Sequence, residues 1–203
     1  AGDPPARSIR DGIRYFGNDI DVIVPGDVGG GVVMNAGVAE AFAPREFMEF
    51  VDEIQVMDFE GNVKTIDKKD LKISYRHTDG WQPGIITSVK ISWPMNIDDT
   101  ILQKVKDANR TRLTKQPLDM PSCGSVFKNP PNHKAAQLID QSGLKGFRIG
   151  DAQVSLKHAN FIVNVGNAKA KDIWEVIQHV RETVLEKQKV SLTTEVVKLG
   201  LWN

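Results

Sequence analysis

The amino-acid sequence predicts an α+β protein, with antiparallel strands prevailing in the first half of the chain and helices in the second. Two patterns favour this class. Apolar and polar residues alternate with a period of two in residues 52–58 and again in residues 85–93, as is typical of half-buried strands. Within residues 169–187, isoleucine and valine recur at intervals of four, three and four residues, which predicts an amphipathic helix.

The first half contains a series of strand patterns separated by turn residues. The turn Glu60-Gly61-Asn62 joins two alternating segments, and this arrangement predicts a β-hairpin. The elements expected in this half are a strand at 20–24, a glycine-rich helix within 26–37, the hairpin of 52–58 and 63–66, and strands at 71–75 and 85–93.

The second half begins with a helix that either Asp98 or Asp99 can start. Gln116-Pro117 ends the helical pattern, because proline has no amide hydrogen and clashes with the preceding turn. We take this break as a domain boundary. The elements expected beyond it are helices at 134–141 and 169–187, a turn-rich passage around Gly146 and Gly150, and strands at 160–165 and 192–199.

The composition excludes several classes of protein. The 203 residues carry 26 basic and 26 acidic side chains, so charge gives no argument for nucleic acid or an anionic membrane as partner. The single cysteine excludes an intrachain disulfide framework, and the dispersed histidines form no metal motif. No apolar run approaches the roughly 20 residues of a membrane helix. We therefore expect a cytoplasmic monomer that acts on small molecules and binds no metal.

The segment from Pro121 to Pro130 concentrates reactive side chains in a stiff loop or short strand. It could be a surface turn without a function. A Cys123 nucleophile assisted by a histidine is possible, although a structural role is simpler for this small residue. Ser125 lacks the glycine two positions later that a nucleophile elbow has.

Arg76 at a strand end and Glu195 in an apolar strand are the other candidates for chemistry. A buried carboxylate is costly without a partner, but an outward-facing glutamate explains the same pattern. Residues 26–31 could cradle a phosphate or form a tightly packed glycine turn. They match neither the P-loop nor the dinucleotide fingerprint.

Several of these segments, in this order, resemble the bacterial UDP-N-acetylenolpyruvoylglucosamine reductases. The similarity runs from about residue 20 to the end of the chain. The motifs that carry it are Val24 to Gly37, Tyr75-Arg76, Lys115 to Leu118 with Pro121 to Pro130, Leu138 to Asp140, Leu144 to Gly146, Arg148 to Gly150, Val154 to Asn164, and Thr194 to Val196 before Gly200.

The resemblance implies that FAD, reduced by NADPH, carries a hydride to UDP-N-acetylglucosamine enolpyruvate, which gives UDP-N-acetylmuramate for peptidoglycan synthesis. It also implies three parts of the chain. Residues 1–116 would be the second lobe of a two-lobed FAD-binding domain, 117–190 a smaller α+β substrate-binding domain, and 191–203 a strand returning to the flavin domain.

The resemblance assigns roles residue by residue. Ser125 would donate the proton, and Arg76 and Glu195 would stabilise the developing enolate. Residues expected to contact substrate are Lys128, Asn129, Lys157 and His158. Residues expected to contact the flavin are Gly26, Asp27, Val28, Gly29, Gly30, Asn35, Ala36, Gly37 and Tyr75.

Two departures from the family pattern concern the cofactor. The sequence has no Gly-x-Gly-Ser-Asn loop, which the family carries in an N-terminal flavin lobe, and Asp27 stands where the family usually has threonine or serine. A carboxylate near a pyrophosphate repels it. The alternative function is therefore a flavin-free module that binds a UDP-sugar and has no activity on its own.

Overall fold

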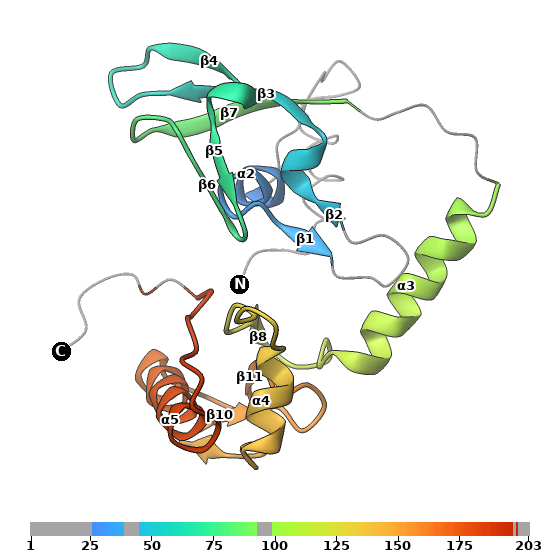
Figure 1. The fold of residues 1–203 in the computed structure, drawn as a ribbon, viewed down its shortest axis with the longest axis vertical. Helices are drawn as coiled ribbons and strands as arrows, with labels where there is room; N and C mark the ends of the chain where they lie inside the picture. Colours follow the sequence, from blue (N-terminus) through green and yellow to red (C-terminus); the bar gives the residue numbers. More distant parts are fainter. Residues whose placement is uncertain (1–25, 39–44, 93–98, 197, 199–203) are drawn as a thin grey trace. The chain divides into compact units, whose positions relative to one another are not determined.

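The computed structural model describes residues 26–38, 45–92, 99–196 and 198. They belong to two compact units, which divide the chain between Ile97 and Asp98. Each unit combines helices with antiparallel strands (Figure 1), so the predicted α+β class is confirmed. The strand expected at 20–24 lies outside the described residues.

The first unit is organised around an antiparallel sheet with the strand order β4-β3-β7. Ile54 stands opposite Ile66 on one side and Val89 on the other, and all three side chains are buried. The alternation in the sequence thus reflects one face of this sheet, and the predicted hairpin is confirmed. The three strands are β3 (Val51–Met57), β4 (Val63–Asp67) and β7 (Ile85–Ile91).

A glycine-rich helix and two short hairpins complete the first unit. Helix α2 buries Val32 in the same core as the sheet, and the expected helix in this segment is confirmed. The added elements are α2 (Gly26–Val33), β1 (Gly37–Val38), β2 (Arg45–Glu46), the 3-10 helices η1 (Phe47–Glu49) and η2 (Lys68–Asp70), β5 (Lys72–Ser74) and β6 (His77–Asp79).

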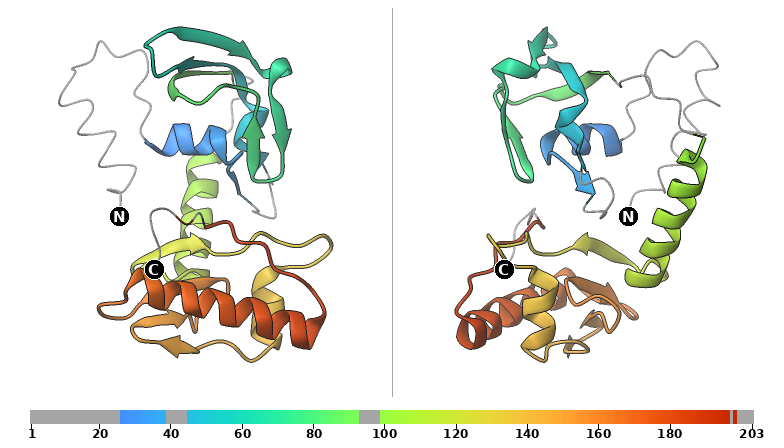
Figure 2. Two further views of the ribbon diagram at one scale, coloured as in Figure 1. Left: turned by 90° about the vertical axis from the view of Figure 1, so that its left-hand side faces the viewer. Right: turned by 45° about the vertical axis from the view of Figure 1, so that its right-hand side comes forward.

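The second unit contains a four-stranded antiparallel sheet in the order β8-β11-β10-β9. Helix α5 packs against β9, β10 and α4 (Figure 2). The elements are α3 (Ile101–Lys115), β8 (Ser122–Ser125), α4 (Ala135–Gln141), β9 (Arg148–Ile149), β10 (Ala152–Val154), β11 (Phe161–Asn164) and α5 (Ala170–Gln188).

The amphipathic pattern of α5 explains how this unit is held together. Val176, Ile177, Val180 and Val184 are all buried in its core, in agreement with the predicted stripe. The helix begins where Lys169 N–H donates to Asp172 Oδ2 at 2.9 Å, which satisfies one of the amides at the helix start. No helix in the described ranges combines the length and the hydropathy that crossing a bilayer requires.

The strand expected at 192–199 is wrong in extent. In the described part of this segment, the structure has a single antiparallel bridge between Thr194 and Phe127, and Leu192 is buried in the core of the second unit. Two backbone hydrogen bonds flank this bridge, from Lys128 N–H to the Thr193 carbonyl and from Glu195 N–H to the Val126 carbonyl, so the pairing is short. Whether later residues return to another part of the protein stays a prediction.

The core of the second unit gives a first test of the fold. Ile139 of α4 is 0% exposed, so we expect Ile139→Ala to lower the free energy of unfolding by about 2–5 kcal/mol. Leu102 of α3 is 71% exposed, and Leu102→Ala should change it by less than about 0.5 kcal/mol. Denaturant unfolding followed by circular dichroism measures both, and equal losses would contradict the buried position of Ile139.

Candidate active site

Ser125 ends strand β8 of the second unit, opposite Phe161 of β11. Its side chain is exposed. Among the residues that the structure describes, none forms a hydrogen bond with the Ser125 hydroxyl. The hydroxyl is therefore available to a ligand.

A bulge in β8 directly precedes Ser125. Between Ser122 and Ser125 the strand has one more residue than β11 has between Val163 and Phe161. Gly124 lies in this bulge with φ of 79°, a left-handed conformation that glycine adopts without strain. Because bulges bend a strand and re-aim its side chains, Gly124 sets the direction in which Ser125 leaves the sheet.

Glu195 lies on a chain segment that runs alongside the residues following Ser125. Glu195 N–H donates to the Val126 carbonyl at 2.8 Å, and Lys128 N–H donates to the Thr193 carbonyl at 2.9 Å. The structure thus brings the backbone of Ser125, Lys128 and Glu195 together at one place in the second unit. Their chemical roles stay predictions.

The other residues predicted to contact substrate have structural partners. Asn129 Oδ1 accepts a hydrogen bond from Ala135 N–H at 3.0 Å, at the start of α4. Lys157 Nζ donates to the Leu113 carbonyl at 2.6 Å. The buried Ser155 hydroxyl accepts from the amides of Lys157 and His158. These contacts fix the two loops on which the candidates lie.

His158 provides a prediction of pH dependence. Its Nδ1 is buried without a hydrogen-bond partner, and its ring meets Phe161 edge-on at 4.9 Å. Burial, opposed by a backbone hydrogen bond and aided by the charge of Lys145, lowers the pKa of His158 below its ordinary value of 6.5. We expect its imidazole to be neutral at pH 7.

The sign of the effect on stability follows from this lowered pKa. Below about pH 6.5 the unfolded chain binds the proton more readily than the folded chain does, so stability is lost as the pH falls from that value. Nitrogen NMR of the ring should show a midpoint below 6.5, and His158→Asn should remove the acid-side loss of stability. A midpoint above 6.5 would contradict the buried environment.

In the first unit, Arg76 is held against the segment that follows α2. Its guanidinium donates to the carbonyls of Asn35 at 3.3 Å and Gly37 at 3.0 Å, and its cationic carbon lies 5.0 Å from the centre of the Tyr75 ring. Arg76 also has a φ of 57°, which is uncommon for a residue with a side chain. Such conformations cluster at functional sites.

The side chain of Asn35 is committed to the interior of the first unit. It is 0% exposed. Its amide group donates to Glu46 Oε2 at 2.7 Å and to the Ser74 carbonyl at 3.1 Å, and its oxygen accepts from Met48 N–H at 3.2 Å. Both amide hydrogens are used, so any contact of Asn35 with a cofactor would have to come from its backbone.

The glycines of α2 differ in their surroundings. A side chain built at Gly29 or Gly30 would meet no atom within 4 Å, whereas one at Gly31 would meet the Phe47 ring at 3.2 Å. Gly31 is thus explained by packing, and Val28 also packs against the core. An open glycine backbone, the exposed ring of Tyr75 and the cation of Arg76 together suit a large anionic cofactor with an aromatic ring.

The remaining candidates lie in both units. Ala36 is exposed, and the Asp27 side chain lies outside the described residues. Arg76 belongs to the first unit, while Ser125 and Glu195 belong to the second, so their meeting stays a prediction.

Two other kinds of chemistry find no support in the described ranges. Desolvation raises the pKa of the Cys123 thiol, which favours the protonated form over the nucleophilic thiolate. The described residues contain no group of three or more histidine, cysteine or acidic side chains that could hold a metal ion.

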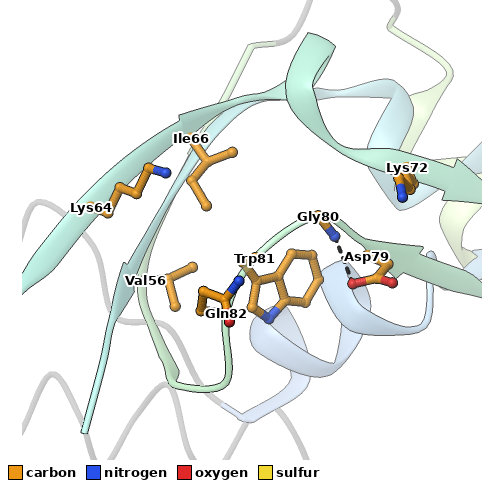
Figure 3. A pocket seen from close by; sticks show the side chains of 8 residues that line it. All are labelled: Val56, Lys64, Ile66, Lys72, Asp79, Gly80, Trp81 and Gln82. Atoms are coloured by element: carbon orange, nitrogen blue, oxygen red, sulfur yellow. Dashed lines mark hydrogen bonds between the residues drawn. The ribbon is translucent and has the colours of Figure 1, made fainter.

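A pocket of about 280 Å³ lies in the first unit between the β3–β4 hairpin and the segment after β6 (Figure 3). Val56 and Ile66 contribute apolar side chains, Trp81 an indole ring, and Lys64 and Lys72 ammonium groups. The pocket contains none of the residues that the sequence singled out.

Sequence reasoning missed Asn160, which directly precedes β11. Its side chain is buried and contacts the backbone of Phe127, two residues after Ser125. The signal available in the sequence was an amide residue at the start of a run of apolar strand residues, a position at which burial requires hydrogen-bond partners.

Comparison with known proteins adds independent information. Residues 116–199 match the family model of the C-terminal domain of UDP-N-acetylenolpyruvoylglucosamine reductase. Proteins named UDP-N-acetylenolpyruvoylglucosamine reductase from Clostridium tetani and Listeria welshimeri are 40% and 43% identical to the chain over 178 residues, which is 87% of this chain. The same alignments cover 57% and 59% of those two relatives.

A solved structure gives a similar result. The crystal structure of UDP-N-acetylenolpyruvylglucosamine reductase from Thermus caldophilus matches with a TM-score of 0.70 and 34% identity, covering 92% of this chain and 66% of that one. The chain therefore resembles these reductases over most of its own length and spans somewhat more than half the length of the curated relatives.

Proposed function

Because residues 116–199 are a C-terminal domain of the UDP-N-acetylenolpyruvoylglucosamine reductase family, we propose that this chain is part of such an enzyme. The proposed reaction is the NADPH-dependent reduction of UDP-N-acetylglucosamine enolpyruvate to UDP-N-acetylmuramate. The proposed setting is the cytoplasm, with the enzyme acting as a monomer on small molecules in peptidoglycan synthesis. The domain limits proposed are those implied by the resemblance, at residues 116 and 190.

One observation carries the proposal furthest. The resemblance assigns Ser125, Lys128 and Glu195 to the reaction, and Glu195, although distant in the sequence, lies on a backbone segment next to the one that carries Ser125 and Lys128. The bulge at Gly124 supports the same interpretation, because it bends the strand directly before Ser125.

The chemistry requires a proton donor at a defined carbon. FAD, reduced by NADPH, would supply the hydride that adds to the methylene carbon of the enolpyruvyl group. The electron pair of the double bond then moves to the carbon next to the carboxylate, as an enolate. Ser125 Oγ–H gives its proton to that carbon, and solvent restores the hydroxyl. Lys128 can stabilise the serine oxygen while it carries negative charge.

Two residues would stabilise the enolate. Arg76 would place a cation near the enolate. A charge that is already in position stabilises the negative charge that develops in the transition state. Glu195 would act on the substrate carboxylate from the segment beside Val126. Neutral His158 would donate a hydrogen bond to the substrate without adding charge, and Asn129 and Lys157 would bind the remaining polar groups.

The cofactor would be held by the first unit. Gly29 and Gly30 offer an open backbone, and Tyr75 and Arg76 offer an aromatic face and a cation. Gly26, Asp27, Val28, Ala36 and Gly37 are further proposed contacts, together with the backbone of Asn35.

The test is to purify the protein and add FAD, NADPH and UDP-N-acetylglucosamine enolpyruvate. The proposal expects a yellow protein that bleaches with NADPH and regains colour when the substrate is added. A colourless protein that still binds the enolpyruvate substrate in calorimetry would favour the alternative, a flavin-free UDP-sugar module. Binding of neither ligand would contradict both.

A further inference from the structure

We propose that Asn160 is a positioning residue that holds the Ser125–Lys128 segment in the geometry needed for proton donation. The inference rests on the proposed function for its catalytic half. The immobilisation of the segment by one buried amide, its structural half, depends only on the contacts of Asn160.

Asn160 forms three hydrogen bonds with two consecutive residues. Its side chain accepts from Phe127 N–H at 3.0 Å and donates to the Phe127 carbonyl at 2.8 Å. Its own carbonyl accepts from Val126 N–H at 2.9 Å. Asn160 is 5% exposed, Phe127 2% and Val126 0%, so water cannot take over these hydrogen bonds if the amide is removed.

The side-chain amide of Asn160 takes the place of a neighbouring strand where the pairing of β8 with β11 ends. Regular pairing of β8 with β11 stops at Ser125 and Phe161. One residue further along, the side chain of Asn160 satisfies both backbone groups of Phe127 in the way that a neighbouring strand would. The opposite edge of the same segment is bonded to Thr193 and Glu195.

Two features therefore constrain the backbone on either side of Ser125. The Gly124 bulge bends the strand before it, and the Asn160 amide holds the backbone after it. Because a misplacement of about 1 Å can cost about 10²-fold in rate, a loosened Phe127 would slow proton transfer from Ser125. The reduction of the cofactor does not use this segment.

The experiment compares Asn160→Asp and Asn160→Ala with Asn164→Ala in the full protein. Asn160→Asp keeps the shape and the bond from Phe127 N–H, but in its ionised form it has no donor for the Phe127 carbonyl. Asn164 is the matched control. It is an asparagine four residues further along, and its Oδ1 accepts from Gly166 N–H and Ala168 N–H, away from Phe127.

Three quantities are measured on each variant: kcat, the rate of FAD reduction and amide hydrogen exchange. Steady-state and stopped-flow kinetics give kcat for the enolpyruvate substrate and the rate of FAD reduction by NADPH. Amide hydrogen exchange gives the protection of Phe127 and Lys128. We expect both Asn160 variants to lose about 10- to 100-fold in kcat with unchanged FAD reduction. Asn160→Ala, which loses the acceptor of Phe127 N–H, should also show at least 10-fold faster exchange at Phe127. Asn164→Ala should stay within about twofold in all three.

The outcomes separate the inference from the proposed function. If the wild-type protein reduces the substrate and the Asn160 variants lose no more kcat than Asn164→Ala, the positioning role is overturned. If the wild-type protein has no activity, the proposed function fails. The exchange rate of the Phe127 amide then tests whether Asn160 immobilises the segment, and unchanged protection in Asn160→Ala overturns that role. Asn160→Asp, which conserves volume, serves if Asn160→Ala does not fold.

Discussion

Replacing Ser125 by alanine is expected to slow reduction of the enolpyruvyl substrate by about 10²- to 10⁴-fold. The change removes the hydroxyl that would give its proton to the carbon next to the carboxylate, and it adds no bulk. Reduction of FAD by NADPH should proceed at the wild-type rate, because no proton from Ser125 is needed for it. The free energy of unfolding should change by less than about 0.5 kcal/mol, since Ser125 is exposed.

Stopped-flow absorbance of the flavin measures the two half-reactions separately. Ser191→Ala is the matched control, because Ser191 is an exposed serine of the second unit, and its variant should keep both rates. An equal loss in the two half-reactions of Ser125→Ala would show that the substitution harms the cofactor site or the fold. Unchanged substrate reduction would assign the proton to another group.

Elements with strong local patterns were predictable from the sequence. The β3–β4 hairpin combined alternation on both strands with a glycine-containing turn, and α5 combined a long apolar stripe with an acidic first turn. In both cases the pattern reports one buried face, which is fixed by the neighbours along the chain. The family resemblance then supplied residue roles that no periodicity contains.

Elements without a local pattern were missed. Strands β9 and β10 contain two and three residues, too few for alternation to be recognised, and β6 follows the left-handed turn at Arg76. Their formation depends on partners brought close by the fold. The extent of the C-terminal strand likewise depends on a tertiary partner, Phe127, which bridges Thr194.

The candidate site shows the same division between local and tertiary information. Ser125 was found by its motif, but its surroundings were not. Asn160 reaches Phe127 across 33 residues of sequence, and Arg76 reaches Asn35 across 41. Such contacts are made by tertiary structure. The signal that the sequence held for Asn160, an amide at the start of an apolar run, was missed.

Replacing Arg76 by methionine is expected to lower kcat/KM for the enolpyruvate substrate by about 10²- to 10³-fold. The guanidinium is held by the carbonyls of Asn35 and Gly37, so its charge is already in place before substrate arrives. Loss of these charged hydrogen bonds should also lower the free energy of unfolding by about 1.5–3 kcal/mol. Lys68→Met is the control, because Lys68 also donates to a backbone carbonyl of the first unit, that of Glu49.

A second substitution separates the backbone of Arg76 from its side chain. Asparagine tolerates the left-handed conformation that Arg76 adopts at φ of 57°, but it carries no charge. Arg76→Asn should therefore regain part of the stability that Arg76→Met loses, while kcat/KM stays as low as in Arg76→Met. If Arg76→Asn recovered both quantities, the turn conformation alone would matter and the cation would have no part in the reaction. Kinetics and denaturant unfolding of the two variants, side by side with Lys68→Met, distinguish these outcomes.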